Sequence, residues 1–128
     1  MPSDAVAAGG TLSVASAHAA TNTQSEDTHM IMRMTWGKLR AGSWNDFEKT
    51  YNATVAKKGA KIKGLRGRWL LQDTGDKDTG FAISLWDSAA DMQAYENSDL
   101  YRKEFAPALQ PFFVGDYKTY RCEVKYHQ

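Results

Sequence analysis

The chain has 128 residues, of which 42% are hydrophobic and 24% charged, and its formal net charge is +1 at pH 7. This length and composition are typical of one soluble globular domain. The near-neutral charge argues against a nucleic-acid partner, and no apolar stretch approaches the ~18 residues that a membrane span needs. The single cysteine, Cys122, cannot form a disulfide within the chain, so we expect a cytoplasmic protein.

Residues 1–29 differ in composition from the rest of the chain. They are rich in Ala, Gly, Ser and Thr, contain no aromatic residue and show no sustained hydrophobic period. Such a segment buries too little apolar surface to offset its ordering entropy, so we expect a disordered N-terminal tail. The AHAA sequence at residues 17–20 resembles a signal-peptide cleavage site, but no basic segment precedes it, so secretion is the weaker alternative. The folded domain is expected over residues 30–128.

The first half of this domain shows a strand pattern and then a helix pattern. Alternation over residues 29–39, HMIMRMTWGKL, predicts a strand with methionines and Trp36 on one face and Arg33 and Thr35 on the other. Ser43 begins a helix pattern over residues 43–58, and Gly59 is a plausible stop. The basic run AKKGAKIKGLRGR, residues 56–68, is typical of a solvated helix end and turn.

The second half begins with two strand patterns, over residues 63–73 and 81–86, joined by a polar turn, which predicts a hairpin. Ser88 begins a helix pattern with Asp91 three residues on, and a second helical piece covers LYRKEFAPAL, residues 100–109. Pro107 and Pro111 are expected to end or kink it. Alternation over residues 114–126 predicts the last strand.

The order strand, helix, strand, strand, helix, strand is that of an α+β, ferredoxin-like βαββαβ fold with an antiparallel sheet. The helices are expected to cover one sheet face. We expect the other face to carry Arg33, Thr35, Ser84 and Trp86. A tryptophan exposed there would be covered by a second sheet, which predicts a homodimer.

The third strand ends in LWDS, and AADMQAYENSD follows it. This pattern resembles the antibiotic biosynthesis monooxygenase (ABM) family of the dimeric α+β barrel superfamily, over about residues 30–126. The resemblance implies a dimeric α+β barrel. It also implies a function related to the cofactor-free oxygenases of polycyclic phenols or to the haem-degrading oxygenases of that family.

Trp86 matches the active-site tryptophan that both of these branches place at the end of the third strand. The haem-degrading branch also has an asparagine on the first strand and a histidine on the following helix, and here these positions fall at Thr35 and near Phe105. Without that imidazole there is no axial iron ligand, which disfavours haem degradation. The phenol-oxidising branch has an asparagine four residues before the tryptophan, where this chain has Ala82.

The expected cavity face combines arginines with an aromatic ring, which suits an anionic or phenolate ligand. The predicted catalytic residues are Trp86 and Arg33, and the predicted substrate-binding residues are Thr35, Arg66, Arg68, Ser84 and Tyr120. Two alternatives stay open: Trp86 only packs the dimer cavity, or the arginines point to solvent or pair with acidic residues.

The family resemblance implies a mechanism without a cofactor, in which a deprotonated phenol passes an electron to O2. We therefore predict a cofactor-independent monooxygenase that oxidises a small aromatic or polyketide-like phenol or quinol. The alternative is a non-catalytic small-molecule-binding or stress-associated module on the same fold. No metal site is predicted, because His18 lies in the tail and His29 and His127 could supply only two ligands at a frayed edge of the sheet.

Overall fold

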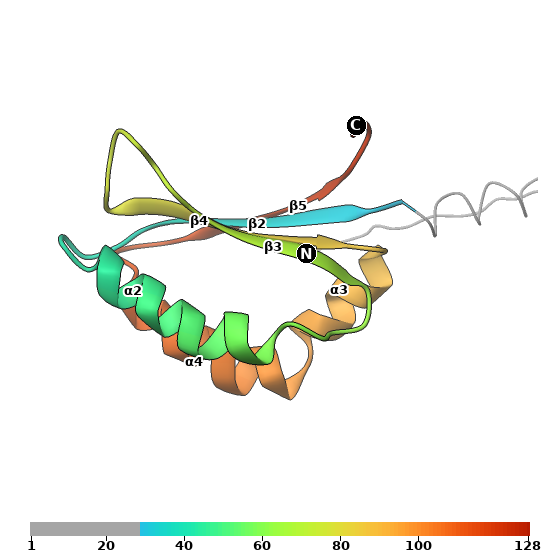
Figure 1. Cartoon of the computed structure of the whole chain (residues 1–128), viewed down its shortest axis with the longest axis horizontal. Helices are drawn as coiled ribbons and strands as arrows, with labels where there is room; N and C mark the ends of the chain where they lie inside the picture. The colour runs from blue at the N-terminus through green and yellow to red at the C-terminus, as the bar shows by residue number, and fades with distance from the viewer. Residues whose placement is uncertain (1–28) are drawn as a thin grey trace, which may run out of the picture.

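The computed structural model describes residues 29–128, so the predicted N-terminal tail and signal sequence lie outside the described residues except for His29. Four strands form one antiparallel sheet in the order β3-β4-β2-β5, and the helical segments lie together beneath one of its faces (Figure 1). This arrangement confirms the predicted ferredoxin-like α+β fold. The elements in chain order are β2 (Ile31–Lys38), α2 (Trp44–Tyr51), η1 (Asn52–Ala56), β3 (Leu65–Gln72), β4 (Thr79–Trp86), α3 (Ala89–Glu96), η2 (Leu100–Phe105), α4 (Ala106–Leu109), η3 (Gln110–Phe112) and β5 (Lys118–Glu123).

The register of the sheet fixes which residues share a face. Ser84 of β4 lies opposite Arg33 of β2 and opposite Arg68 of β3, so these three side chains lie on the same face. In β3, Leu65 pairs with Trp86 and Gly67 with the next residue, Leu85. Arg66 is therefore the extra residue of a β-bulge, which takes it out of the alternation that the sequence suggested.

The helices cover the face that carries Arg33, Thr35, Ser84 and Trp86, so the expectation that these residues lie on the helix-free face was wrong. Trp86 is 0% exposed and packs within the core beneath the sheet. Two glycines on this face leave room for aromatic side chains that pack beneath the sheet. A Cβ added at Gly37 would lie 2.2 Å from the Phe113 ring, and one at Gly80 would lie 2.5 Å from the Trp44 ring.

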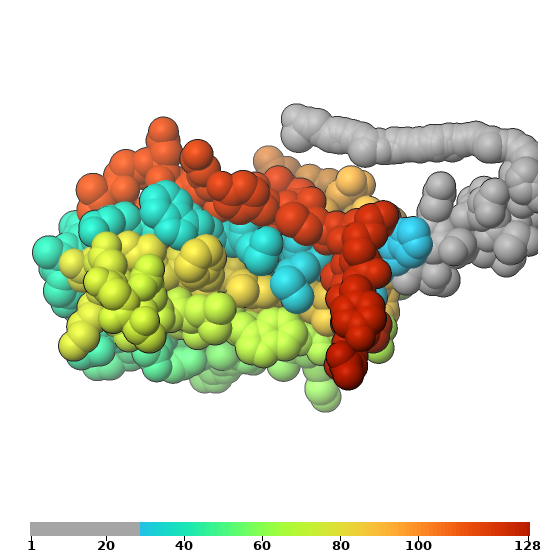
Figure 2. Space-filling view, turned by 90° about the horizontal axis from the view of Figure 1, so that it is seen from above, coloured from blue at the N-terminus to red at the C-terminus, as the bar shows by residue number. Residues whose placement is uncertain are grey.

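The helix-free face carries the apolar residues that the sequence suggested would be buried. Trp69 and Leu71 of β3 are 45% and 43% exposed, and Tyr120 of β5 is 49% exposed. Figure 2 looks down on this face, and the C-terminal residues lie across the ends of the strands. The methionines at 30, 32 and 34, together with Leu85 and Cys122, line a shallow groove there.

Local signals place the helical segments as predicted, with one difference. Ser88 caps α3, because its hydroxyl oxygen accepts a hydrogen bond of 3.1 Å from the backbone N–H of Asp91. The difference is that η1 and η2 are π-helical turns. Such turns are rare and often occur at functional sites.

Candidate functional site

A small cavity of about 70 Å³ lies between the helix-covered face of the sheet and the helices. Aromatic and aliphatic side chains form most of its wall, including residues from both π-helical turns. Arg33 and Arg68 are its only charged lining residues within the described part of the chain. The other lining residues are Thr35, Phe47, Tyr51, Val55, Ala82, Ile83, Ser84, Tyr95, Tyr101, Phe105, Ala106, Leu109, Gln110, Phe113 and Tyr117.

Arg68 has hydrogen-bonding groups that the surrounding protein does not use. Its Nε and Nη2 atoms are buried, and neither has a hydrogen-bond partner among residues 29–128. Its guanidinium carbon lies 5.1 Å from the centre of the Tyr95 ring, a cation–π contact. Gly59 leaves room for this group, since a Cβ there would come within 3.1 Å of Nη2. A buried cation with unused donors is costly unless an anion accepts from it, so this position suits an anionic ligand.

Arg33, in contrast, is neutralised inside the protein. Its Nε donates to the Glu96 carboxylate, and its Nη2 donates to the Tyr101 hydroxyl at 3.0 Å. Burial alone would lower the pKa of Arg33, but Tyr101 and Glu96 raise it overall. Arg121 of β5 also contacts Glu96, at 2.9 Å. Arg68 is therefore the charged lining residue that is available to a ligand.

The tryptophan singled out by the family pattern lies behind the cavity wall. Trp86 donates from Nε1 to the Ser84 hydroxyl at 2.8 Å, and its ring lies 4.9 Å from the ring of Tyr95. Tyr95 in turn lies 5.1 Å from Tyr101, and both tyrosines line the cavity. Trp86 thus supports Ser84 and Tyr95, which form part of the wall, and it is not a lining residue itself.

Two buried tyrosines flank the free arginine. Burial raises the pKa of Tyr51 and of Tyr95, and the nearby positive charge of Arg68 offsets part of each increase. Both phenols therefore remain protonated at neutral pH. They supply hydroxyl groups and ring faces to the site, and neither is suited to act as a base there.

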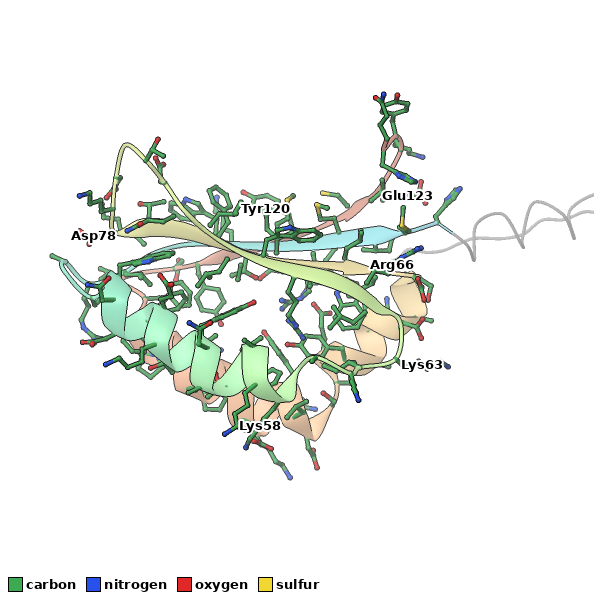
Figure 3. All side chains as sticks on the ribbon, viewed as in Figure 1. Lys58, Lys63, Arg66, Asp78, Tyr120 and Glu123 are labelled. Carbon is green, nitrogen blue, oxygen red and sulfur yellow. The ribbon has the colours of Figure 1, made fainter. Side chains whose placement is uncertain are left out.

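The structure brings together four of the seven predicted site residues at the cavity: Arg33, Thr35, Arg68 and Ser84. The Thr35 hydroxyl also hydrogen-bonds that of Thr119 at 2.9 Å. Arg66 lies outside the cavity and is exposed, 3.5 Å from Asp87, because the bulge turns it away. Tyr120 lies on the opposite face of the sheet (Figure 3). The roles predicted for these residues stay predictions.

Four tyrosines line the cavity, at positions 51, 95, 101 and 117, and none of them is among the predicted site residues. Tyr51 and Tyr95 belong to the apolar sides of the two helix patterns. Their helical spacing relative to Val55 and Met92 predicted burial and gave no sign of a ligand site. Phe105, near the position of the histidine in the haem-degrading branch, is buried and lines the cavity.

The described residues contain neither a metal-binding cluster of His, Cys, Asp or Glu side chains nor a helix able to span a membrane. Within residues 29–128, no group of three or more His, Cys, Asp or Glu side chains is arranged to hold a metal ion. No helix in that range has the length and apolar character needed to cross a membrane.

Comparisons with known proteins agree with the fold. A structure of a conserved protein from Methanosarcina mazei Go1 superposes with a TM-score of 0.68 at 12% identity, covering 80% of this chain and 99% of that one. A candidate antibiotic biosynthesis monooxygenase from Caulobacter crescentus CB15 gives 0.68 at 17% identity, covering 83% and 99%. SnoaB, a cofactor-independent oxygenase from Streptomyces nogalater solved as a mutant, gives 0.67 at 15% identity, covering 77% and 95%.

No curated protein matches the chain. The sequence model described as "Antibiotic biosynthesis monooxygenase" matches residues 30–106, which is more than half of the 128 residues. The matched segment contains the strand residues that line the cavity, among them Arg33, Thr35 and Ser84, and it also contains Trp86 behind the wall. This protein belongs to the antibiotic biosynthesis monooxygenase family.

Proposed function

We propose that this protein is a cofactor-independent monooxygenase that oxidises an aromatic phenol or quinol with O2, as a homodimer in the cytoplasm. One observation carries the proposal: an aromatic-lined cavity contains the guanidinium of Arg68, whose buried Nε and Nη2 atoms have no acceptor among the described residues. Family membership and the fold shared with SnoaB, a cofactor-independent oxygenase, support the reaction class.

Arg68 is the proposed anion-binding residue. A guanidinium that donates to a phenolate oxygen stabilises the anion and so lowers the pKa of the bound phenol. Tyr51 and Tyr95 hold the ring between aromatic faces. The apolar remainder of the wall excludes water, which strengthens the interaction between the guanidinium and the anion.

The reaction is illustrated by an anthrone, whose enol form is a phenol. Its anion gives one electron to O2, and the resulting carbon radical and superoxide combine to form a C–O bond. The peroxide anion takes up a proton, and loss of water then leaves a quinone. One oxygen atom of O2 enters the product and the other leaves as water, so the substrate supplies all the electrons and no cofactor is needed.

The homodimer is supported by the helix-free face of the sheet. Trp69, Leu71 and Tyr120 are exposed there beside the methionines of β2. Exposed apolar surface of this kind is unfavourable in water and usually marks an interaction site. A second copy that packs the same face against this one would bury it and form the barrel that gives the superfamily its name.

Oxygen uptake in the presence of 1,8-dihydroxyanthrone tests the reaction. We expect consumption of one O2 per quinone formed, above the rate without protein, and loss of that excess in Arg68→Met. Gln72→Met, an exposed position on the same strand, is the matched control and should keep full activity. Tight binding of the anthrone without O2 uptake would instead favour the non-catalytic binding module.

A further inference from the structure

The shallow groove on the helix-free face gathers most of the sulfur atoms in the described part of the chain. Three of the four methionines among residues 29–128, at positions 30, 32 and 34, line it together with the single cysteine, Cys122. His127, from the C-terminal segment, lines it as well. Figure 3 shows sulfur atoms above the sheet between the labelled Tyr120 and Glu123. The groove is separate from the cavity beneath the sheet, since the two have no lining residue in common.

The strand register places the cysteine at the centre of the methionines. Cys122 of β5 lies directly opposite Met32 of β2. The antiparallel ladder extends from this pair to Met30 on one side and to Met34 on the other. Met30 and Met34 are therefore the diagonal neighbours of Cys122, at about 7–8 Å, a separation that long side chains can bridge. One thiol thus has three thioethers around it.

The sulfur ligands are accessible from solvent. Cys122 is exposed, and the three methionines are half-buried. The Met30 sulfur lies 3.5 Å from Nη1 of Arg66, a residue that also lines the groove, so this thioether faces the groove. A methionine side chain has three rotatable bonds and a polarisable sulfur, so it can adjust to a bound ion.

The chemistry of these donors selects a soft metal ion. Thiolate and thioether sulfur favour Cu(I), whereas Mg²⁺ and Ca²⁺ prefer carboxylate and carbonyl oxygen. A thiolate bound to Cu(I) carries no net charge, so the positive charges of Arg66 and Lys125 beside the groove do not oppose binding. The sequence prediction of no metal site considered histidine ligands and did not consider thioethers.

We infer that this groove is a binding site for Cu(I), held by the Cys122 thiolate and the Met32 thioether, with Met30 and Met34 supplying further sulfur ligands. Binding turns the thiol into a thiolate and releases its proton, and the metal keeps its oxidation state. The site is independent of the cavity and of the proposed reaction with O2. It lies on the face that is proposed to pack against a second copy, so the alternative role of these methionines is apolar packing in that interface.

Competition with bicinchoninate, a chelator of Cu(I), tests the site in the full-length protein under anaerobic conditions. We expect the wild type to take up one equivalent of Cu(I) per chain. Met32→Leu removes a thioether but keeps the volume and the apolar character that an interface role would need. We expect Met32→Leu and Cys122→Ser each to weaken Cu(I) binding at least tenfold. Met92→Leu, which removes a thioether from the core, is the matched control and should bind Cu(I) like the wild type.

The double variant Met30→Leu and Met34→Leu tests the diagonal ligands, and we expect it also to weaken Cu(I) binding at least tenfold. Zn²⁺ is the comparison ion, because its protein ligands are thiolate, imidazole and carboxylate groups. We expect Zn²⁺ to bind at least tenfold more weakly than Cu(I) and to be insensitive to Met32→Leu.

Three results would overturn the inference. The first is a wild-type protein that takes up no Cu(I) in competition with bicinchoninate. The second is a loss in Cys122→Ser without any loss in the groove methionine variants, because the thiol alone would then hold the ion. The third is an equal loss in Met92→Leu and Met32→Leu, because the substitutions would then act through the fold rather than through a ligand.

Discussion

The covered face of this sheet carries buried polar and charged side chains, and its exposed face carries large apolar ones. In an ordinary monomer the covered face is apolar and the exposed face is polar. The face beneath the helices buries charged and polar side chains, including Arg33 and Ser84. The face without helices exposes Trp69, Leu71 and Tyr120. Buried charge and exposed apolar surface both lower stability, so each is expected only where it serves binding.

The difference separates two roles within one sheet. On the helix-covered face, one of the two cavity arginines is satisfied by Glu96 and Tyr101, and the other, Arg68, has free donors, which fits the proposed ligand site. The helix-free face exposes large apolar side chains, which fits the proposed packing against a second copy.

Charge on the helix-free face should separate the subunits. The double change Trp69→Lys and Leu71→Lys places two like charges where a second copy would pack, and desolvating them is unfavourable. We expect a dimer in the wild type and a monomer in the variant, measured by light scattering after size exclusion. The double change Ala53→Lys and Ala94→Lys, on the helical side, adds the same two charges and should remain dimeric. A wild-type monomer would contradict this interpretation of the face.

Removing the carboxylate partner of Arg33 should strongly lower the unfolding free energy of the protein. Glu96→Gln leaves the buried guanidinium without its carboxylate, and breaking such a pair costs about 3 kcal/mol of unfolding free energy. Urea unfolding measures this loss. Arg121→Gln removes an exposed contact to the same carboxylate and should cost less than about 1 kcal/mol. Equal losses in the two variants would show that Arg33 and Glu96 do not form a specially stabilising pair.

Replacing Arg68, whose donors are unsatisfied, should leave the stability of the protein unchanged or raise it. Arg68→Met keeps much of the side-chain volume and removes a buried charge that has unsatisfied donors. We expect unchanged or higher stability, by up to about 2 kcal/mol, together with loss of anion binding. A clear loss of stability in urea would mean that Arg68 holds the fold together, and the ligand-site account would then lose its main support.

The stability of the protein is expected to depend slightly on pH through Asp76 in the β3–β4 turn, which lies away from both faces. Hydrogen bonds from Lys38, from the Thr79 hydroxyl and from the backbone N–H of Asp78 lower the pKa of Asp76 from 3.8 to about 2. Because this pKa is lower in the folded protein, the stabilisation is present above pH ~4 and is lost as the pH falls towards 2. Asp76→Asn should therefore lower the Tm at pH 5 and have little effect near pH 2.

The control for this turn is Asp116→Asn, which removes the same charge from the exposed loop before β5. It should change the Tm less than Asp76→Asn does at pH 5. If the two variants lose the same amount across pH 2 to 6, the effect comes from net charge, and the hydrogen bonds of Asp76 contribute nothing specific.

The order of the elements was predictable from the sequence because it depends on local signals. The period of two in the strands, the Ser88 cap and the polar turn at residues 74–80 each act within a few residues. The sequence also correctly grouped Ser84 with Trp86 and Arg33 with Thr35 on shared faces. Alternation alone makes such groupings, without reference to the rest of the molecule.

The identity of the covered face was not predictable in the same way. It depends on whether the aromatic side chains of the helical layer fit over Gly37 and Gly80, which is a property of tertiary packing. The bulge at Arg66 separates two arginines that alternation had placed together. The cavity tyrosines were missed for a related reason, since helical spacing predicts burial and cannot show what the buried ring faces.

The central claim is that Arg68 offers its charge to a phenolate in the cavity, and the pKa of a bound phenol tests it most directly. We would titrate 4-nitrophenol, followed by its phenolate absorbance, with saturating wild-type protein and with Arg68→Met. A nearby guanidinium should lower the pKa of the bound phenol by roughly 1–2 units, whereas burial without that charge should raise it. The account predicts a lowered pKa in the wild type and a raised pKa in the variant. The same pKa in both proteins would contradict it.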